Sequence, residues 1–242
     1  MDAPAQYLEE LRSDLALYPT WLPTDPIELG AFGTLKRGKL HVDGRLGDLG
    51  IDVIATTSET SDAPIRKSRG VRFRATSQAN ATSALVDASL GVTLEMERDH
   101  AWVFAARGIT TVEIKNIAAV RDAVLEAQKD GRWQREWLLV TELRRVQTLN
   151  VMIARSRATR ARVVAKGTVA AADVLLADDV TVQRDSDDLF TIENHAAATP
   201  LYALRKLQGF LRPGLRPIRG GGGPAQDGLE LEVSPEEPFG FD

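Results

Sequence analysis

The sequence of 242 residues predicts an α+β fold, with a twisted, mainly antiparallel sheet and flanking helices. Several segments alternate apolar and polar residues, as strands with one wet face do. A few others repeat apolar residues at helical spacing. The strand-like segments cluster instead of alternating regularly with helices, so a doubly wound parallel sheet is the weaker alternative.

The first predicted element is an amphipathic helix over about residues 3–17, ended by Pro19. Its apolar face consists of Tyr7, Leu8, Leu11 and Leu15. Prolines and glycines then recur every few residues as far as Val53, which leaves room only for short strands. Residues 35–42 are one candidate strand.

Clear alternation begins in the predicted strand at 65–78, where Val71 and Phe73 can face one way and Arg72 and Arg74 the other. The pattern recurs over residues 92–97. Two more strands are predicted at 101–106 and 110–114. Asp99 and His100 are expected in a hairpin turn just before the first of these.

The period then becomes helical. Asn116 is a plausible N-cap for a helix over residues 117–128, which Asp130 and Gly131 stop. Further strands are predicted at 133–147, 149–156, 161–165 and 180–183. The Arg144–Arg145 pair interrupts apolar residues with β propensity on both sides, which favours two antiparallel strands over one helix.

A final helix is predicted from Pro200, with Thr199 as its cap. Its apolar face would hold Leu201, Leu204, Leu207 and Leu211.

Composition restricts the class of protein. Hydrophobic residues make up 43%, enough for a sizeable core, and there is no cysteine. Disulfides, thiolate metal sites and a cysteine nucleophile are therefore excluded, and a cytoplasmic location is expected. The first residues are too acidic for a signal peptide, and no apolar run approaches the roughly 20 residues of a spanning helix.

The end of the chain differs from the rest. Residues 224–242 hold six acids and no base, so their removal changes the formal net charge from −4 to +2. We therefore expect a single α+β body over residues 1–215 and a Gly-rich linker with an acidic tail over residues 216–242. The negative total argues against a nucleic-acid partner.

No catalytic, cofactor-binding or metal site is expected. His41, His100 and His195 have no metal-ligand spacing, and Asp99–His100 is better explained as a solvated turn than as a general base. The glycines at 220–223 lack the Lys and Ser/Thr of a phosphate loop. An enzyme is the least favoured class of function.

Basic residues gather in one segment: Arg144, Arg145, Arg155, Arg157, Arg160, Arg162 and Lys166. They are consistent with a solvated sheet edge, with nucleic-acid binding, or with attraction to anionic lipid, where each basic residue contributes about 1 kcal/mol. Composition does not choose among the three.

The run from Trp137 to Ser156, WLLVTELRRVQTLNVMIARS, resembles a strand pair of gasdermin pore-forming domains, most closely at Val140, Thr141 and Glu142. The order of predicted elements is also similar to that family. The resemblance implies a gasdermin N-domain-like fold with a brief autoinhibitory C-terminal peptide that a protease removes. Bacterial members often carry an acylated cysteine near the N-terminus, which this chain lacks.

The resemblance thus implies a membrane pore former, activated by proteolysis, in cell death or antiphage defence. Its expected partners are anionic membrane lipids, an activating protease and copies of itself, with movement from the cytoplasm to the inner membrane. The expected membrane or subunit contacts are Arg144, Arg145, Arg155, Arg157, Arg160 and Arg162.

The expected cleavage region contains Arg212, Arg216 and Arg219, and the expected autoinhibitory strand contains Leu229, Leu231 and Val233. The alternative is a non-enzymatic α+β interaction protein whose acidic tail docks on a partner or on itself.

Overall fold

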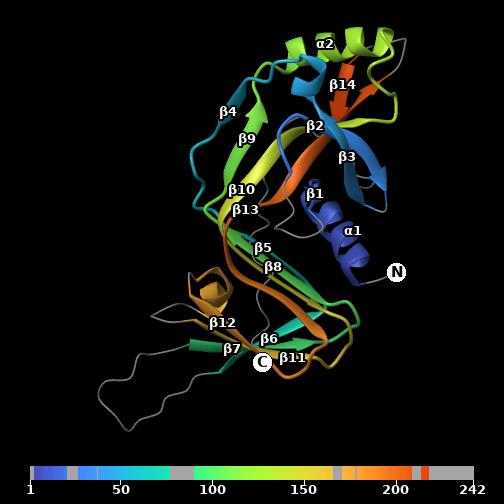
Figure 1. Cartoon of the computed structure of the whole chain (residues 1–242). Helices are drawn as coiled ribbons and strands as arrows, with labels where there is room; N and C mark the ends of the chain where they lie inside the picture. Colours follow the sequence, from blue (N-terminus) through green and yellow to red (C-terminus); the bar gives the residue numbers. More distant parts are fainter. Residues whose placement is uncertain are drawn as a thin grey trace. The chain divides into compact units, whose positions relative to one another are not determined.

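The computed structural model describes residues 3–20, 27–36, 38–76, 90–165, 171–177, 179–208 and 214–217. These residues form two compact units (Figure 1). Unit 1 comprises Met1–Ala63, Gly108–Gln147 and Ala197–Gly221, and unit 2 contains Pro64–Arg107 and Thr148–Ala196. The expected division into a body of residues 1–215 and a tail of residues 216–242 stays a prediction.

Unit 1 is a sheet with two helices. Its elements are α1 (Ala3–Leu15), β1 (Tyr18–Pro19), β2 (Ala31–Lys36), β3 (Lys39–Arg45), the 3-10 helix η1 (Leu46–Leu49), β4 (Ala55–Thr57), β9 (Thr110–Ile114), α2 (Ile117–Lys129), β14 (Gly214–Pro217), and parts of β10 (Leu138–Ala154) and β13 (Leu189–Gln208). β10 pairs with β2 and β9, β2 with β3, and β9 with β4, while β1 and β14 pair with β13; all these pairs are antiparallel.

Helix α1 confirms the predicted N-terminal helix. It buries Tyr7, Leu8 and Leu11, and it ends at Leu15. The guanidinium of Arg12 lies 5.6 Å from the ring centroid of Tyr18 on β1, which is a cation–π distance.

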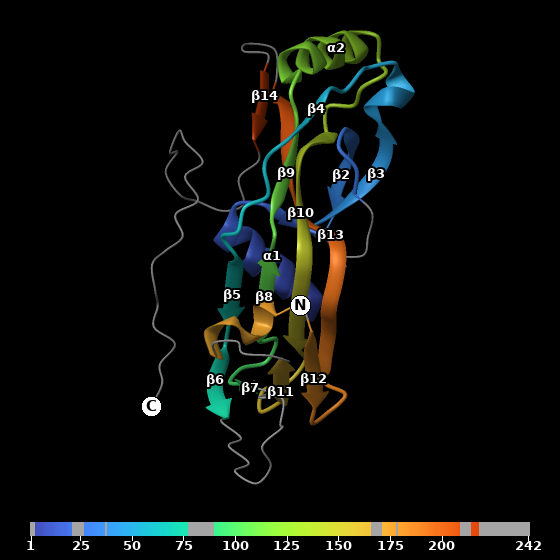
Figure 2. The same cartoon turned by 90° about the vertical axis from the view of Figure 1, so that its left-hand side faces the viewer.

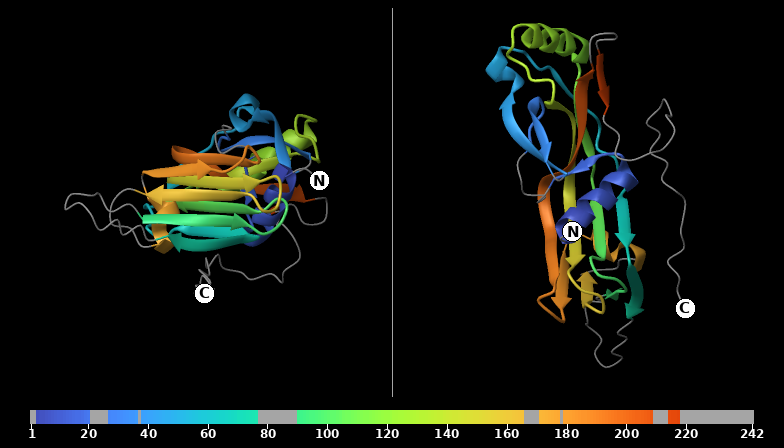
Figure 3. Two further views of the ribbon diagram at one scale, coloured as in Figure 1. Left: turned by 90° about the horizontal axis from the view of Figure 1, so that it is seen from below. Right: turned by 90° about the vertical axis from the view of Figure 1, so that its right-hand side faces the viewer.

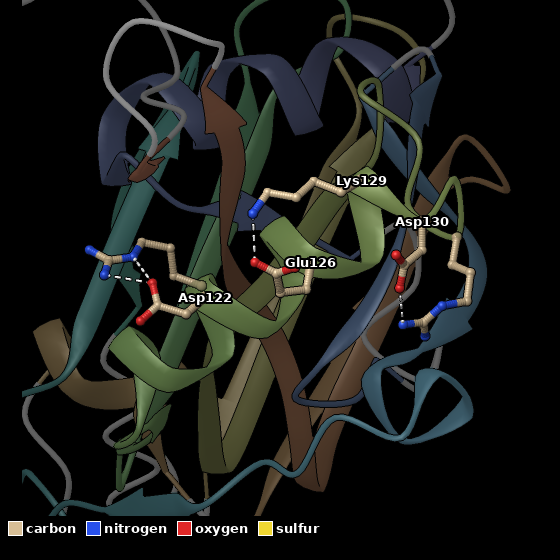
Figure 4. Close-up of polar contacts among 6 residues, drawn as sticks. Asp122, Glu126, Lys129 and Asp130 are labelled. Carbon is tan, nitrogen blue, oxygen red and sulfur yellow. Dashed lines mark hydrogen bonds and ion pairs between the residues drawn. The ribbon is translucent and has the colours of Figure 1, made fainter.

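Helix α2 confirms the helix predicted after Asn116. Val120, Val124 and Ala127 pack into a core with residues of β2, η1 and β10, and Figure 3 shows α2 beside the blue segment that contains η1. Exposed ion pairs lie on α2 and just after its end (Figure 4): Arg121–Asp122 and Lys129–Glu126 on the helix, and Arg132–Asp130 after it.

Asn116 occupies the N-cap position of α2, but its side chain makes no capping hydrogen bond. Its Oδ1 accepts from the Ile54 backbone N–H at 2.9 Å, and its Nδ2 donates to the Asp52 carbonyl at 3.0 Å. The residue therefore ties the start of α2 to the segment before β4.

Unit 2 contains two antiparallel sheets packed face to face. Its own elements are β5 (Ile65–Arg69), β6 (Val71–Thr76), β7 (Leu90–Met96), β8 (Trp102–Arg107), β11 (Arg160–Ala165), the 3-10 helix η2 (Ala171–Leu176) and β12 (Val180–Arg184). One sheet has the order β12-β11-β7-β6, seen side by side in Figure 2. In the other, β8 lies between β5 and the second part of β10.

The core of unit 2 lies between these sheets. Val92, Leu94 and Met96 of β7 pack with Val103 of β8 and Met152 of β10. The alternation predicted in these two strands is confirmed at Val71 and Phe73 of β6 and at Val92, Leu94 and Met96 of β7, which face the core. Together the antiparallel sheets and the two helices confirm the predicted α+β class.

Two strand predictions and one turn prediction need correction. Residues 35–42 are not one strand but the hairpin β2–β3, which turns at Gly38 with φ +79°. The strand predicted at 65–78 is divided into β5 and β6 at Gly70, where φ is +64°. At both positions glycine adopts the left-handed backbone without a Cβ clash. Asp99 and His100 do not form a hairpin turn, because β7 and β8 belong to different sheets.

The predicted break at Arg144–Arg145 is wrong. β10 runs unbroken from Leu138 to Ala154, and both arginines pair with β9, opposite Thr111 and Thr110. The paired backbone continues through the charged residues, because charge at a side chain does not remove a ladder hydrogen bond.

The predicted final helix is also wrong, because its residues belong to β13. Tyr202 pairs with Tyr18 and Leu201 with Pro19, so tertiary pairing overrides the helical spacing of the leucines. Ala197, with φ 55°, breaks the regular alternation just before Pro200. Leu211 lies outside the described residues.

Candidate functional site

The structure divides the six candidate arginines between the two units. Arg144 and Arg145 lie in unit 1, and Arg155, Arg157, Arg160 and Arg162 lie in unit 2. Lys166, the remaining base of this segment, lies outside the described residues. The sequence cluster therefore forms two groups whose environments differ.

Arg144 is held by neighbours. Its Nε lies 2.7 Å from Glu142 Oε1, and the two side chains are only 13% and 14% exposed. Its Nη1 donates to the Thr111 hydroxyl at 2.6 Å. The Nε–carboxylate contact is a close ion pair without the direction of a hydrogen bond. Arg145 is exposed, so it is the member of this pair that an external anion can reach.

Arg155 and Arg157 lie on the turn between β10 and β11, and both are exposed. Two carboxylates and a carbonyl fix this turn. Asp99 Oδ1 accepts from the Arg157 backbone N–H at 2.7 Å, and the Asp188 carbonyl accepts from the Arg155 N–H at 2.8 Å. Ser156 Oγ donates to Asp188 Oδ2 at 2.8 Å. The turn thus presents two arginine side chains on a backbone anchored to its neighbours.

Arg160 and Arg162 lie on β11, on the face of the four-stranded sheet that is turned away from the core. This outer face also carries Arg72 and Arg74 of β6 and Glu95 of β7. Glu95 Oε2 accepts from Arg74 Nε at 3.0 Å, and Glu95 Oε1 lies 3.6 Å from Arg160 Nε. One carboxylate therefore serves two arginines on opposite sides.

Sequence reasoning placed Arg72 and Arg74 on a wet face but did not count them as site residues. The signal was present in the spacing. The pairs Arg72/Arg74, Arg160/Arg162 and Glu95/Glu97 all have the same spacing, with one residue between the two members of each pair. Opposite charges facing each other across strands stabilise a sheet, so this pattern predicts the order β6-β7-β11.

The remaining predicted residues lie mostly beyond what the structure covers. Arg212, Arg219, Leu229, Leu231 and Val233 are outside the described residues. Arg216 lies in β14, opposite Lys206 of β13.

Among the described residues, no group of three His, Asp or Glu side chains could hold a metal ion. No helix in the same part of the chain has both the length and the apolar character needed to cross a membrane.

The fold is similar to two solved gasdermin structures. One is the gasdermin A3 membrane pore, with 11% identity, a TM-score of 0.36, and coverage of 87% of this chain and 94% of that one. The other is a bacterial gasdermin from Bradyrhizobium tropiciagri, with 12% identity, a TM-score of 0.35, and coverage of 89% and 90%. No protein-family model and no curated protein matches the chain.

Both solved structures are gasdermins, the family named by the resemblance at Trp137–Ser156.

Proposed function

We propose that this chain is a gasdermin-like, non-enzymatic protein that forms pores in membranes containing anionic lipid. The observation that carries the proposal is the sheet β12-β11-β7-β6, which is apolar on one face and charged on the other. A strand that lines a membrane pore needs this division, with apolar side chains toward lipid and polar ones toward water. Pore formation then requires the apolar face to leave the unit 2 core.

Exposed arginines supply the proposed first contact with the membrane. Arg145, Arg155, Arg157 and Arg160 are exposed, whereas Arg144 is held by Glu142 and Arg162 is partly buried. Surface bases near an anionic bilayer contribute about 1 kcal/mol each. In the proposed sequence of events these arginines bind lipid or a neighbouring copy before the sheet inserts.

The acidic tail is the proposed inhibitor. Residues 224–242 would cover the basic body over residues 1–215, with Leu229, Leu231 and Val233 as the apolar side of an added strand. Proteolysis would then release the body from its cytoplasmic state to the inner membrane as a homo-oligomer. Cell death or antiphage defence is the proposed biological role.

The activating cut is proposed between Arg219 and Gly220. Of the three arginines in the cleavage region, Arg212 and Arg216 are each followed by proline. Proline has no N–H and a fixed φ, and it restricts the residue before it, so a protease that reads arginine cuts such bonds poorly. Arg216 is also paired within a sheet. Limited trypsin digestion should yield a fragment ending at Arg219, and Arg219→Gln should prevent this cut.

Dye release from anionic liposomes tests the function. We expect a variant ending at Arg219 to release dye and to form rings, and the full chain to do neither. If the shortened chain gives neither leakage nor oligomers, the pore function is wrong. A stable partner recovered only with the tail present would then favour the interaction protein.

The absence of cysteine allows a sharper test with single labels. Phe73 packs against the core and Arg74 faces outward on the same strand. Phe73→Cys and Arg74→Cys form a matched pair for a polarity-sensitive dye. On liposomes, the dye at position 73 should enter an apolar environment while the dye at position 74 stays in water. Equal signals at the two positions would contradict insertion of this strand.

A further inference from the structure

One row of side chains crosses the outer face of the four-stranded sheet without a carboxylate. Arg74 of β6 is opposite Thr93 of β7, Thr93 is opposite Arg162 of β11, and Arg162 is opposite Gln183 of β12. All four side chains can donate hydrogen bonds. The row therefore places one guanidinium group on each side of the Thr93 hydroxyl.

These side chains share one face because their sequence neighbours point the other way. Phe73, Val92, Leu94 and Val163 all pack into the unit 2 core. Successive residues of a strand face opposite sides of a sheet, so Arg74, Thr93 and Arg162 must point outward together.

Arg162 lacks a partner for one donor. Its Nε is shielded from solvent and, within the described part of the chain, makes no hydrogen bond. A donor that has lost water without gaining an acceptor is unfavourable, so an anion bound here would relieve that cost. Arg74 donates from Nε to Glu95, and its side chain is exposed.

The charges around the row favour an anion. The outer face holds Arg72, Arg74, Arg160 and Arg162, and two carboxylates form ion pairs with three of these arginines. Glu97 pairs with Arg72, and Glu95 is shared by Arg74 and Arg160. Glu95 is thus shared by two arginines, and Arg162 forms no ion pair with the other residues that the structure describes.

We infer that Arg74, Thr93 and Arg162 bind a phosphate group, either as a lipid headgroup or as a free phosphate. Neighbouring strands are about 4.8 Å apart, so the Cα atoms of the two arginines lie about 10 Å apart with Thr93 between them. Long arginine side chains converge easily over that span. Their planar donors suit the oxygens of a phosphate, and the hydroxyl adds a third hydrogen bond.

The lipid form of this inference rests on the proposed membrane function, whereas binding of free phosphate does not. The first experiment therefore uses inorganic phosphate and the full chain. Phosphate is titrated while the arginine Nε–H signals are followed by nuclear magnetic resonance. Saturable shifts are expected for Arg162 and Arg74.

The variants distinguish specific phosphate binding at this site from a general effect of the protein's net charge. Arg162→Gln should weaken phosphate binding about tenfold and Thr93→Val about threefold. Thr93→Val keeps the shape and the β preference of the residue, so it tests the hydroxyl without unfolding the sheet. Arg121→Gln, on α2, is the matched loss of one charge and should change nothing. Equal phosphate affinity in Arg162→Gln and Arg121→Gln overturns the site.

Vesicles of phosphatidylglycerol, with phosphatidylcholine vesicles as control, distinguish the two sources of phosphate. If Arg162→Gln weakens binding to both phosphate and the anionic vesicles, the site takes a lipid headgroup; if it weakens only phosphate binding, the site takes a free phosphate. If phosphate causes no shifts of the Arg162 and Arg74 signals but the shortened chain still releases dye, the phosphate site is wrong and the pore function stands. If phosphate causes the shifts but the shortened chain releases no dye, the pore function is wrong and the phosphate site stands.

Discussion

The hydroxyl groups of three buried tyrosines are the titrating groups that burial perturbs most clearly in unit 1. Burial raises the pKa of Tyr7, of Tyr18 and of Tyr202, the last from 10.0 to about 12. The rings of Tyr18 and Tyr202 are stacked, with centroids 6.0 Å apart, at the pairing of β1 with β13. Ionising these hydroxyls therefore opposes the fold where its N-terminal strand is attached.

The direction of the pH effect follows from the raised pKa. Stability from Tyr202 is complete below pH 10.0 and falls as the pH rises toward about 12, because the unfolded chain ionises first. The loss is about 1.4 kcal/mol per pH unit for each such tyrosine. Urea unfolding at several alkaline pH values should show this decline, and Tyr202→Phe should make it shallower. If stability declines equally with pH in Tyr202→Phe and in the unchanged protein, Tyr202 is not a source of the decline.

The ion pair of Glu142 and Arg144 is the second prediction at the scale of residues. Glu142→Gln leaves a guanidinium that is 13% exposed without its counter-charge, and should lower the free energy of unfolding by about 2 kcal/mol. Glu126→Gln is the matched control, because its pair with Lys129 is 65% and 68% exposed. The midpoint temperature of thermal unfolding should fall for Glu142→Gln and stay unchanged for Glu126→Gln. Equal shifts would mean that burial does not strengthen the pair.

At the scale of elements, strands with one consistent period could be predicted and long strands could not. β6, β7 and β11 alternate between one core and one surface, so their sequences show it, whereas β8 is buried on both faces and is a run of apolar residues. β10 and β13 pass through both units, and their surroundings change along their length. Arg144 and Arg145 are adjacent residues that are both incompletely buried, which breaks the alternation within a continuous strand.

The ion pairs of Glu95 with Arg74 and Arg160 supply a prediction for the strands β6, β7 and β11. Glu95 is 23% exposed and serves two arginines, so Glu95→Gln should destabilise the protein by about 1 kcal/mol. The same change should tighten phosphate binding to Arg74 and Arg162, because it removes the nearest negative charge. Glu97→Gln, whose residue is 46% exposed and faces Arg72 alone, should have the smaller effect on unfolding in urea. A larger effect at Glu97 would show that the shared carboxylate is not the main link.

At the scale of the whole molecule, the sequence predicted the fold class and the charged residues but not their grouping. The run from Arg144 to Arg162 looks like one basic segment, yet its members fall into two units. Arg72 and Arg74, far away in the sequence, join Arg160 and Arg162 through the pairing of β6, β7 and β11. Strand order decides which charges meet, and strand order depends on contacts between residues distant in sequence.

Net charge gives the last prediction, because it separates two ways in which the tail could inhibit. Neutralising the six acids changes the formal net charge from −4 to +2 without removing any residue of the tail. Truncation at Arg219 gives the same net charge and also removes the apolar positions 229, 231 and 233. The six acids are Asp227, Glu230, Glu232, Glu236, Glu237 and Asp242.

If the charge of the tail restrains membrane contact, both variants should bind anionic vesicles at least tenfold more tightly than the full chain. Added salt should weaken this binding in both, since screening acts on exposed charges. Dye release should occur only after truncation, because the neutralised tail keeps its apolar side chains. Sedimentation with vesicles and dye release, measured on the same samples, separate the two steps. A neutralised variant that binds no better than the full chain would assign the whole restraint to the apolar residues of the tail.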